Sequence, residues 1–443
     1  MLLFQHCPQV LLLAVLIGPH AAIAQTAEST QPAPILAFTG GNWYDGQGFA
    51  PRIAYIVDGR LTFMAPAQVD STIDLAGGWV VPPYGEAHTH TLLYRRSRIG
   101  DFLQRGIFYA LVMNAHRSVV EAVRDSFGGP ASVDAAFALA GITAPAAHPV
   151  QIGLRGGSTE ADLDGDWVTL VRDYEDLDAK WGALAGSGTD LVKVFLVYSE
   201  EYEDRKDDTA IPMRYHGMDP RLVQEVVRRA HEGDLRVAAH VESGADFHTA
   251  VEAGVDIVAH LPGFAMAPNP AELADTRRLA EIADPARYTI KPADALLAAQ
   301  RGIIVQTTVS GFESFETDPE VVEEVRERLR SFVAARRQVV TQNLRLLKEF
   351  DVEVVLASDA GERDVVDEAL FLHGLGVWST NELLRLLVES TPRSIFPERR
   401  IGRLDEGFEA SFLVLGGNPL EDFERITDIR LRIKDGGLVS PQD

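Results

Sequence analysis

Between about residue 80 and residue 400, the chain alternates short apolar runs with amphipathic helical patterns. The runs are rich in β-branched residues and show no polar alternation, which is typical of strands covered on both faces. Helical periodicity is clearest at 219–234 and 318–350. Eight strand–helix units favour a closed (β/α)8 TIM-type barrel of the α/β class over an open doubly wound sheet. The eight runs are 79–90, 107–114, 134–142, 191–197, 235–241, 256–260, 303–309 and 353–359.

The two ends of the chain have a different sequence pattern, which predicts short strands separated by turn residues. We expect residues 35–81 and 400–443 to pack together as one small β domain, and residues 82–399 to form the barrel. A chain of 443 residues is long enough for one large barrel and a minor domain.

The N-terminus has the pattern of a secretory signal peptide over residues 1–24, followed by a polar leader at 25–34. The apolar core from Val10 to Gly18 is too short to span a bilayer, and Ala22 and Ala24 fit a cleavage site before Gln25. No Lys or Arg precedes the core, so an uncleaved membrane anchor is the alternative. We expect export to the periplasm or the medium, without stable membrane association after cleavage.

The single cysteine, Cys7, lies inside this predicted signal. The mature protein is therefore expected to have no disulfide, no thiolate metal ligand and no cysteine nucleophile. A formal charge of −24 argues against nucleic acid or an anionic membrane surface as partner. A small-molecule substrate is the expected partner, and a homo-oligomer is left open.

Ionisable and metal-binding residues close five of the apolar runs. Side chains two apart on a strand face the same way, so the imidazoles of "HTH" share one face, where a divalent ion would satisfy both. Active sites of barrels lie at the C-terminal ends of the strands, so these residues are expected to meet at one rim. They are His88, His90, Lys193, His240, His260 and Asp359.

With these positions the sequence resembles the amidohydrolase superfamily of metal-dependent hydrolases, in particular its imidazolonepropionase-like and dipeptidase-like branch. The segments "GGWVVPP", "IGRLDEGFEASFLVLGGNPL" and "IRLRIKDGGLV" resemble the entry and exit segments of that superfamily. The resemblance implies two divalent ions, zinc first, with manganese, cobalt or iron as alternatives. His88 and His90 would hold one ion and His240 and His260 the other.

The resemblance also implies roles for the remaining two residues. Lys193 would carry a carbamate that bridges the ions, since burial favours the neutral amine. Asp359 would be a ligand and the catalytic residue that accepts the proton of a metal-bridging hydroxide. Alternatives for them are a lysine snorkelling at a strand end and an aspartate capping the following helix.

Three functions remain open from the sequence. The first is a binuclear hydrolase of an amide or other carbon–nitrogen bond, with esters and lactones included. The second is a mononuclear deaminase-type hydrolase, for which Glu242, two residues after His240, would shuttle protons. The third, from another class, is a metal-free barrel that acts as a binding or scaffold protein.

Residues on the predicted rim loops are candidates for substrate contacts, although each is equally well explained as an ordinary loop residue. These candidates are His148, Arg155, Tyr198, Tyr215 and His216.

Overall fold

The computed structural model describes residues 33–94, 97–207, 215–263, 279–280, 282–310, 321–359, 361 and 363–439. The predicted signal peptide lies outside the described residues. Within the described part of the chain, no helix has both the length and the apolar character needed to cross a membrane.

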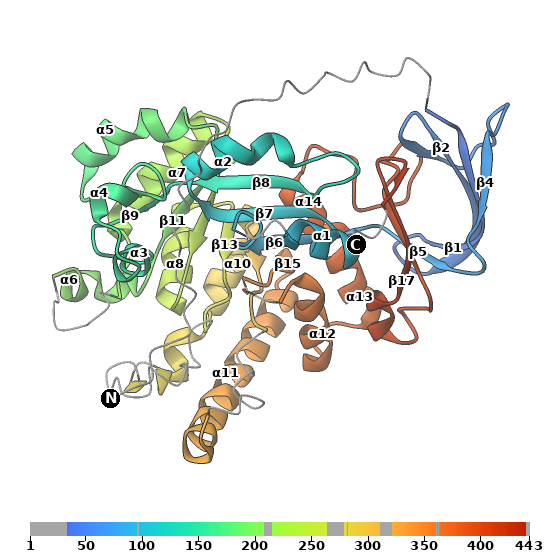
Figure 1. Ribbon diagram of the computed structural model, residues 1–443. Helices are drawn as coiled ribbons and strands as arrows, with labels where there is room; N and C mark the ends of the chain where they lie inside the picture. The colour runs from blue at the N-terminus through green and yellow to red at the C-terminus, as the bar shows by residue number, and fades with distance from the viewer. Residues whose placement is uncertain are drawn as a thin grey trace.

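Eight parallel strands form a barrel, as the strand–helix alternation predicts (Figure 1). Neighbouring strands are hydrogen-bonded in chain order, and two backbone bonds join the last strand segment to the first. Ala87 N donates to Leu356 O at 3.4 Å, and Asp359 N donates to His88 O at 3.0 Å. The strands are β6 (Tyr84–Thr89), β7 (Ile107–Ala115), β8 (Asp134–Leu139), β11 (Leu191–Phe195), β12 (Arg236–His240), β13 (Ile257–Ala259), β14 (Ile304–Gln306) and β15 (Val354–Val355).

The single strand predicted at 134–142 is divided in the structure. Ala140 has a positive φ of 48° and separates β8 from β9 (Gly141–Thr143). β9 pairs with β11 and with the short β10 (Val168–Leu170), which extends the sheet beside the barrel wall.

Helices cover the outside of the barrel. α11 occupies most of the predicted helix at 318–350 and projects away from the barrel body (Figure 1). The helix predicted at 219–234 corresponds to a 3-10 turn at Pro220–Leu222 and α7, which buries Val226, Val227 and Ala230. The α-helices are α1 (Ser97–Gln104), α2 (Arg117–Val123), α3 (Val150–Arg155), α4 (Glu160–Leu163), α5 (Tyr174–Ala185), α6 (Tyr202–Arg205), α7 (Val223–Glu232), α8 (Gly244–Ala253), α10 (Pro292–Arg301), α11 (Glu323–Glu349), α12 (Val365–Leu375), α13 (Thr380–Arg385) and α14 (Thr391–Ile395).

The two ends of the chain share a second sheet beside the barrel, as predicted (Figure 1). Its core contains Phe38, Trp43, Val80 and Phe412. The C-terminal β16 pairs with the N-terminal β5, so neither end can form this sheet alone. The strands are β1 (Leu36–Tyr44), β2 (Phe49–Val57), β3 (Arg60–Thr62), β4 (Ser71–Asp74), β5 (Trp79–Val81), β16 (Phe412–Leu415), β17 (Ile429–Lys434) and β18 (Gly437–Leu438).

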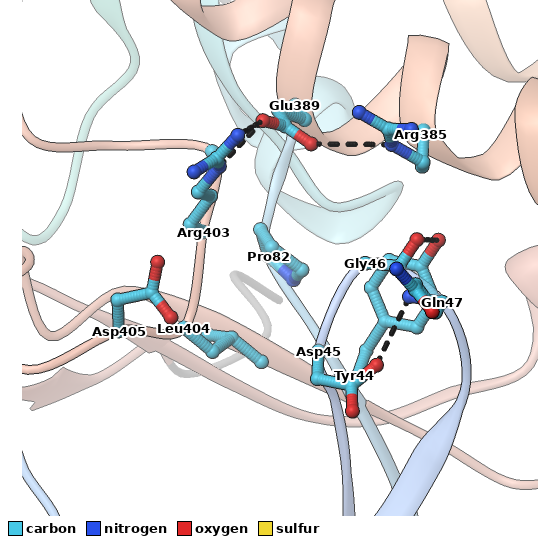
Figure 2. A pocket seen from close by; sticks show the side chains of 11 residues that line it. Tyr44, Asp45, Gly46, Gln47, Pro82, Arg385, Glu389, Arg403, Leu404 and Asp405 are labelled. Atoms are coloured by element: carbon cyan, nitrogen blue, oxygen red, sulfur yellow. Dashed lines mark hydrogen bonds and ion pairs between the residues drawn. The ribbon is translucent and has the colours of Figure 1, made fainter.

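A cavity of about 210 Å³ lies where this domain meets the barrel (Figure 2). Pro82, which precedes β6, lines it, so the cavity is at the N-terminal side of the barrel strands. Glu389 lies between Arg385 and Arg403 on one wall. In TIM barrels this side serves stability, whereas active sites are at the opposite end.

Candidate metal centre

Three of the predicted ligands form a compact group at the C-terminal ends of the strands. His88, His260 and Asp359 each present one ligand atom, and these atoms lie within 4.8 Å of one another. Closure of the barrel produces this arrangement, because it places the end of the eighth strand segment against β6. Asp359 has a φ of 47°, in the left-handed region that non-glycine residues rarely adopt outside special sites.

His90 joins the group from the position directly after β6, the strand that carries His88. The two Nε2 atoms are 3.3 Å apart, and His90 Nε2 is 3.2 Å from Asp359 Oδ1. The His90 side chain is 43% exposed, whereas His88 is buried. The site is therefore open toward solvent on the His90 side.

His240 extends the group across the barrel. Its ring centroid is 4.6 Å from that of His260, which is in turn 4.6 Å from that of His88. Burial lowers the pKa of His240 to about 3, and it also holds the pKa values of His88 and His260 well below the ordinary value. These imidazoles are therefore neutral near pH 7 and can donate lone pairs to a cation.

Lys193 projects from β11 and is 1% exposed. Its Nζ is buried and has no hydrogen-bond partner among the described residues. Burial lowers the pKa of this amine to about 7, although Asp359 acts in the opposite direction. A buried amine without a partner is unfavourable unless another group is bound beside it, so this atom fits a ligand that the polypeptide itself does not supply.

Polar residues behind the histidines orient them. Gln306 accepts a hydrogen bond from His88 Nδ1 at 3.1 Å through Oε1, since its Nε2 donates to Ala87 O at 2.7 Å. His260 Nδ1 lies 2.9 Å from Thr308 Oγ1. With its proton on Nδ1, His88 directs the Nε2 lone pair into the group, which is the orientation of a metal ligand.

Glu86 forms hydrogen bonds to both β6 and the segment after β15, so it joins the first and last strands of the barrel close to the site. Its carboxylate accepts bonds from Ser358 N at 2.9 Å, Ser358 Oγ at 2.7 Å and His88 N at 3.2 Å. Burial raises the pKa of Glu86 to about 8 in spite of these bonds. Neither Glu86 nor Gln306 was identified from the sequence as a site residue, and a polar residue inside an apolar run was the available signal.

In the part of the chain that the structure describes, the residue that caps the following helix is Asp364, not Asp359. Asp364 is the N-cap of α12 and accepts from Val366 N at 2.9 Å. Burial acts to raise the pKa of Asp359, but His88, His90 and Lys193 together lower it below the usual value. The carboxylate is therefore ionised at neutral pH.

Two of the predicted substrate contacts lie beside the imidazoles. The ring of His148 is 4.6 Å from that of His240, centroid to centroid. Tyr215 donates its hydroxyl to Glu242 Oε1 at 3.0 Å, and the same oxygen is 3.3 Å from His240 Nε2. Glu242 is buried, so a carboxylate does stand beside the group on this side.

The other three are not brought into the group by their contacts. Tyr198 is buried between the guanidinium groups of Arg205 and Arg287, and its hydroxyl is 3.0 Å from Tyr288. His216 is buried against Tyr202. Arg155 is exposed at the end of α3.

The donor set fits divalent metal ions. It combines neutral imidazoles, one ionised carboxylate and an amine with no hydrogen-bond partner in the described part of the chain, in a site that is buried on one side and open on the other. His88, His90, His240, His260 and Asp359 could be ligands, and Lys193 lies among them.

No protein-family model matches the chain. Imidazolonepropionase of Pseudomonas putida (strain GB-1) is 33% identical over 102 residues, and a second imidazolonepropionase of Pseudomonas putida is 32% identical over 102 residues. Each match covers 23% of this chain and 23% of the relative, so the chain spans about a quarter of the length of the curated relatives it matches.

Solved structures match over nearly the whole chain. The crystal structure of A. niger ochratoxinase is 17% identical with a TM-score of 0.68, covering 92% of this chain and 96% of that one. A Xaa-Pro dipeptidase with bound methionine in its active site is 18% identical with a TM-score of 0.68, covering 91% and 99%. Molinate hydrolase is 14% identical with a TM-score of 0.66, covering 92% and 95%. The chain therefore shares the fold of these solved structures over nearly its whole length, and it is similar in sequence to imidazolonepropionases over about a quarter of its length.

Proposed function

We propose that the protein is a metal-dependent hydrolase that cleaves an amide or another carbon–nitrogen bond of a small molecule, with esters and lactones as further candidates. The observation that carries this proposal is the convergence of His88, His260 and Asp359 beside the amine of Lys193, which is buried and has no hydrogen-bond partner among the residues that the structure describes. The similar imidazolonepropionases and the Xaa-Pro dipeptidase support the same class of reaction.

Two divalent ions would be held by His88 and His90 on one side and by His240 and His260 on the other. When bound, the ions make water acidic enough to ionise near neutral pH and polarise the scissile carbonyl. The neutral amine of Lys193 adds to carbon dioxide and releases one proton, which converts it into an anionic carbamate with two oxygen donors. The pKa of about 7 leaves a substantial fraction of this amine neutral at physiological pH.

Asp359 is the proton acceptor of the proposed reaction. Its carboxylate lies 3.2 Å from His90 Nε2 through Oδ1 and 3.7 Å from His260 Nε2 through Oδ2, at the centre of the group. Because it is ionised, Asp359 can accept the proton of the attacking water and deliver it to the leaving nitrogen or oxygen. The exposed side at His90 gives substrate and water access to this carboxylate.

Metal analysis of purified protein tests the proposal. We expect close to two divalent ions per wild-type chain, and turnover of at least one compound in a screen of N-acyl amino acids, dipeptides and lactones. Lys193→Ala is expected to lose metal and to lower kcat/KM by roughly 100-fold or more, because the carbamate that would serve as a metal ligand can no longer form. Lys291→Ala, which removes an exposed lysine at the start of α10, is the matched control and should retain both. Full activity and full metal content in Lys193→Ala would contradict the proposed role of Lys193 as a metal ligand.

The mononuclear deaminase-type hydrolase is the second candidate, and the position of Glu242 favours it. This buried carboxylate is 3.3 Å from His240 Nε2, where it could move protons during deamination. The same experiment separates the two candidates. One ion per chain, release of ammonia from an amino-heterocycle and retention of metal in Lys193→Ala would support the deaminase.

A further inference from the structure

The imidazoles of the group differ in the side chain that contacts Nδ1. Behind His88 stands an amide oxygen, that of Gln306, and the orientation of this amide is fixed by its second bond to Ala87 O. The proton of His88 therefore lies on Nδ1 and the lone pair of Nε2 faces inward. This is the tautomer that a metal ligand requires.

In contrast, the group next to Nδ1 of His148 is an amide nitrogen. Gln151 Nε2 is 3.1 Å from His148 Nδ1, and an amide NH₂ group can only donate. With the amide in this orientation, Nδ1 of His148 supplies the lone pair and the proton of the neutral ring lies on Nε2. In the structure Nε2 of Gln151 faces His148, and Oε1 is buried without a hydrogen-bond partner among the described residues.

The backbone and ring of His148 are held firmly in place. Its amide N–H donates to His216 O at 2.8 Å, and its carbonyl accepts from Thr143 Oγ1 at 2.6 Å. The ring packs edge-on against Phe195, with 5.5 Å between centroids, and lies beside His240. The side-chain hydrogen bond of His148 in the described part of the chain is at Nδ1, so in this tautomer the Nε2–H remains available to donate beside His240.

We infer that Gln151 is a positioning residue: it fixes the tautomer of His148 so that Nε2–H donates a hydrogen bond to a substrate oxygen beside His240. The inference rests on the proposed hydrolase function and deepens it by assigning the substrate an acceptor at this point. A carbonyl or carboxylate oxygen satisfies the donor, whereas an ammonium or amide N–H would face a second donor. Gln306 thus gives His88 the tautomer of a metal ligand, whereas Gln151 gives His148 the tautomer of a hydrogen-bond donor to the substrate.

The substitution Gln151→Glu inverts the hydrogen bond with almost no change in shape, because a carboxylate can only accept. Nitrogen NMR of zinc-loaded protein labelled with ¹⁵N-histidine reports the tautomer directly, and the His148 signals are assigned by their loss in His148→Gln. We expect wild-type His148 to carry its proton on Nε2 with Nδ1 unprotonated. In Gln151→Glu, Nδ1 is expected to become protonated.

Kinetics with the N-acyl amino acid or dipeptide that wild type turns over best provides the second readout. Loss of a correctly oriented donor should lower kcat/KM by about tenfold in Gln151→Glu. The decrease should be smaller in Gln151→Met, because methionine removes the preference for one tautomer of His148 without favouring the other. Metal content should equal that of wild type in both variants. Gln338→Glu, the same chemical change at an exposed site on α11, is the control and should change neither readout.

The outcomes separate this inference from the proposed function. A proton on Nδ1 of wild-type His148, or an unchanged kcat/KM in Gln151→Glu with Nδ1 protonated, would overturn the role of Gln151 and leave the hydrolase proposal intact. If no compound in the screen is hydrolysed, the function fails, whereas the tautomer measurement still decides whether Gln151 orients His148.

Discussion

Gln306 shows how a residue that is not a ligand can decide the chemistry of one. Replacing it with leucine removes the acceptor for His88 Nδ1, so the proton can move to Nε2 and block the lone pair that faces the group. We expect Gln306→Leu to weaken metal binding by about 10- to 100-fold, the usual effect of losing such a partner. Competition against a chromophoric chelator measures the affinity, and circular dichroism checks the fold. Gln338→Leu on the exposed face of α11 is the control, and equal affinities in the two variants would refute the role of Gln306.

Which residues converge could be predicted from the sequence better than how they are oriented. His88, His240 and Asp359 end apolar runs, and parallel strands of a barrel bring such ends to one rim. Gln306 was missed because its partner is 218 residues away, and no local pattern encodes that pairing. Tyr198 lies on a rim loop as expected, yet its side-chain direction is set by Arg205 and Arg287 through tertiary packing.

At the scale of elements, Asp246 joins the loop after β11 to the loop after β12. Its carboxylate accepts from the backbone N–H groups of Tyr198 at 2.9 Å, Ser199 at 2.7 Å, Glu242 at 3.0 Å and Ser243 at 3.0 Å. This one residue therefore holds both of the loops that frame the site on the side of Lys193 and His240.

Asp246→Asn is expected to destabilise the fold by about 2–3 kcal/mol, because an amide presents a donor where the carboxylate accepts several bonds. Urea unfolding measures the change. Asp162 occupies the equivalent capping-box position on α4, where its carboxylate bonds only to Thr159 among the described residues, so Asp162→Asn is the matched control. We expect a loss of about 0.5–1 kcal/mol there. Equal losses at the two sites would mean that Asp246 acts only as a helix cap.

The strands and helices were largely predictable because each apolar run has a length and composition that local rules can interpret. The break between β8 and β9 was not, since it depends on the positive φ of Ala140 and on the bond from Gly141 N to Asn114 Oδ1 at 2.8 Å. The pairing of β5 with β16 joins segments more than 300 residues apart. Its only indication in the sequence was that both ends of the chain have the pattern of short strands separated by turns.

At the scale of the whole molecule, the barrel separates the candidate site from the structural junction with the β domain. The imidazoles are at the C-terminal ends of the strands, and the cavity of Figure 2 is at the opposite side, where Pro82 leads into β6. Glu389 is 7% exposed and pairs with three arginines, Arg385, Arg393 and Arg403, which come from α13, α14 and the segment that returns to the β domain.

We therefore expect Glu389→Gln to affect stability and not function. The variant leaves three guanidinium groups without their shared carboxylate, and about half of each arginine side chain is exposed, so solvent screens part of the loss. A decrease of about 1–3 kcal/mol in the free energy of unfolding is expected in urea titrations, with metal content and kcat/KM equal to wild type. Asp405→Asn, at an exposed carboxylate lining the same cavity, is the control and should change stability by less than about 0.5 kcal/mol. Loss of metal in Glu389→Gln would show instead that the junction is coupled through the strands to the opposite end of the barrel.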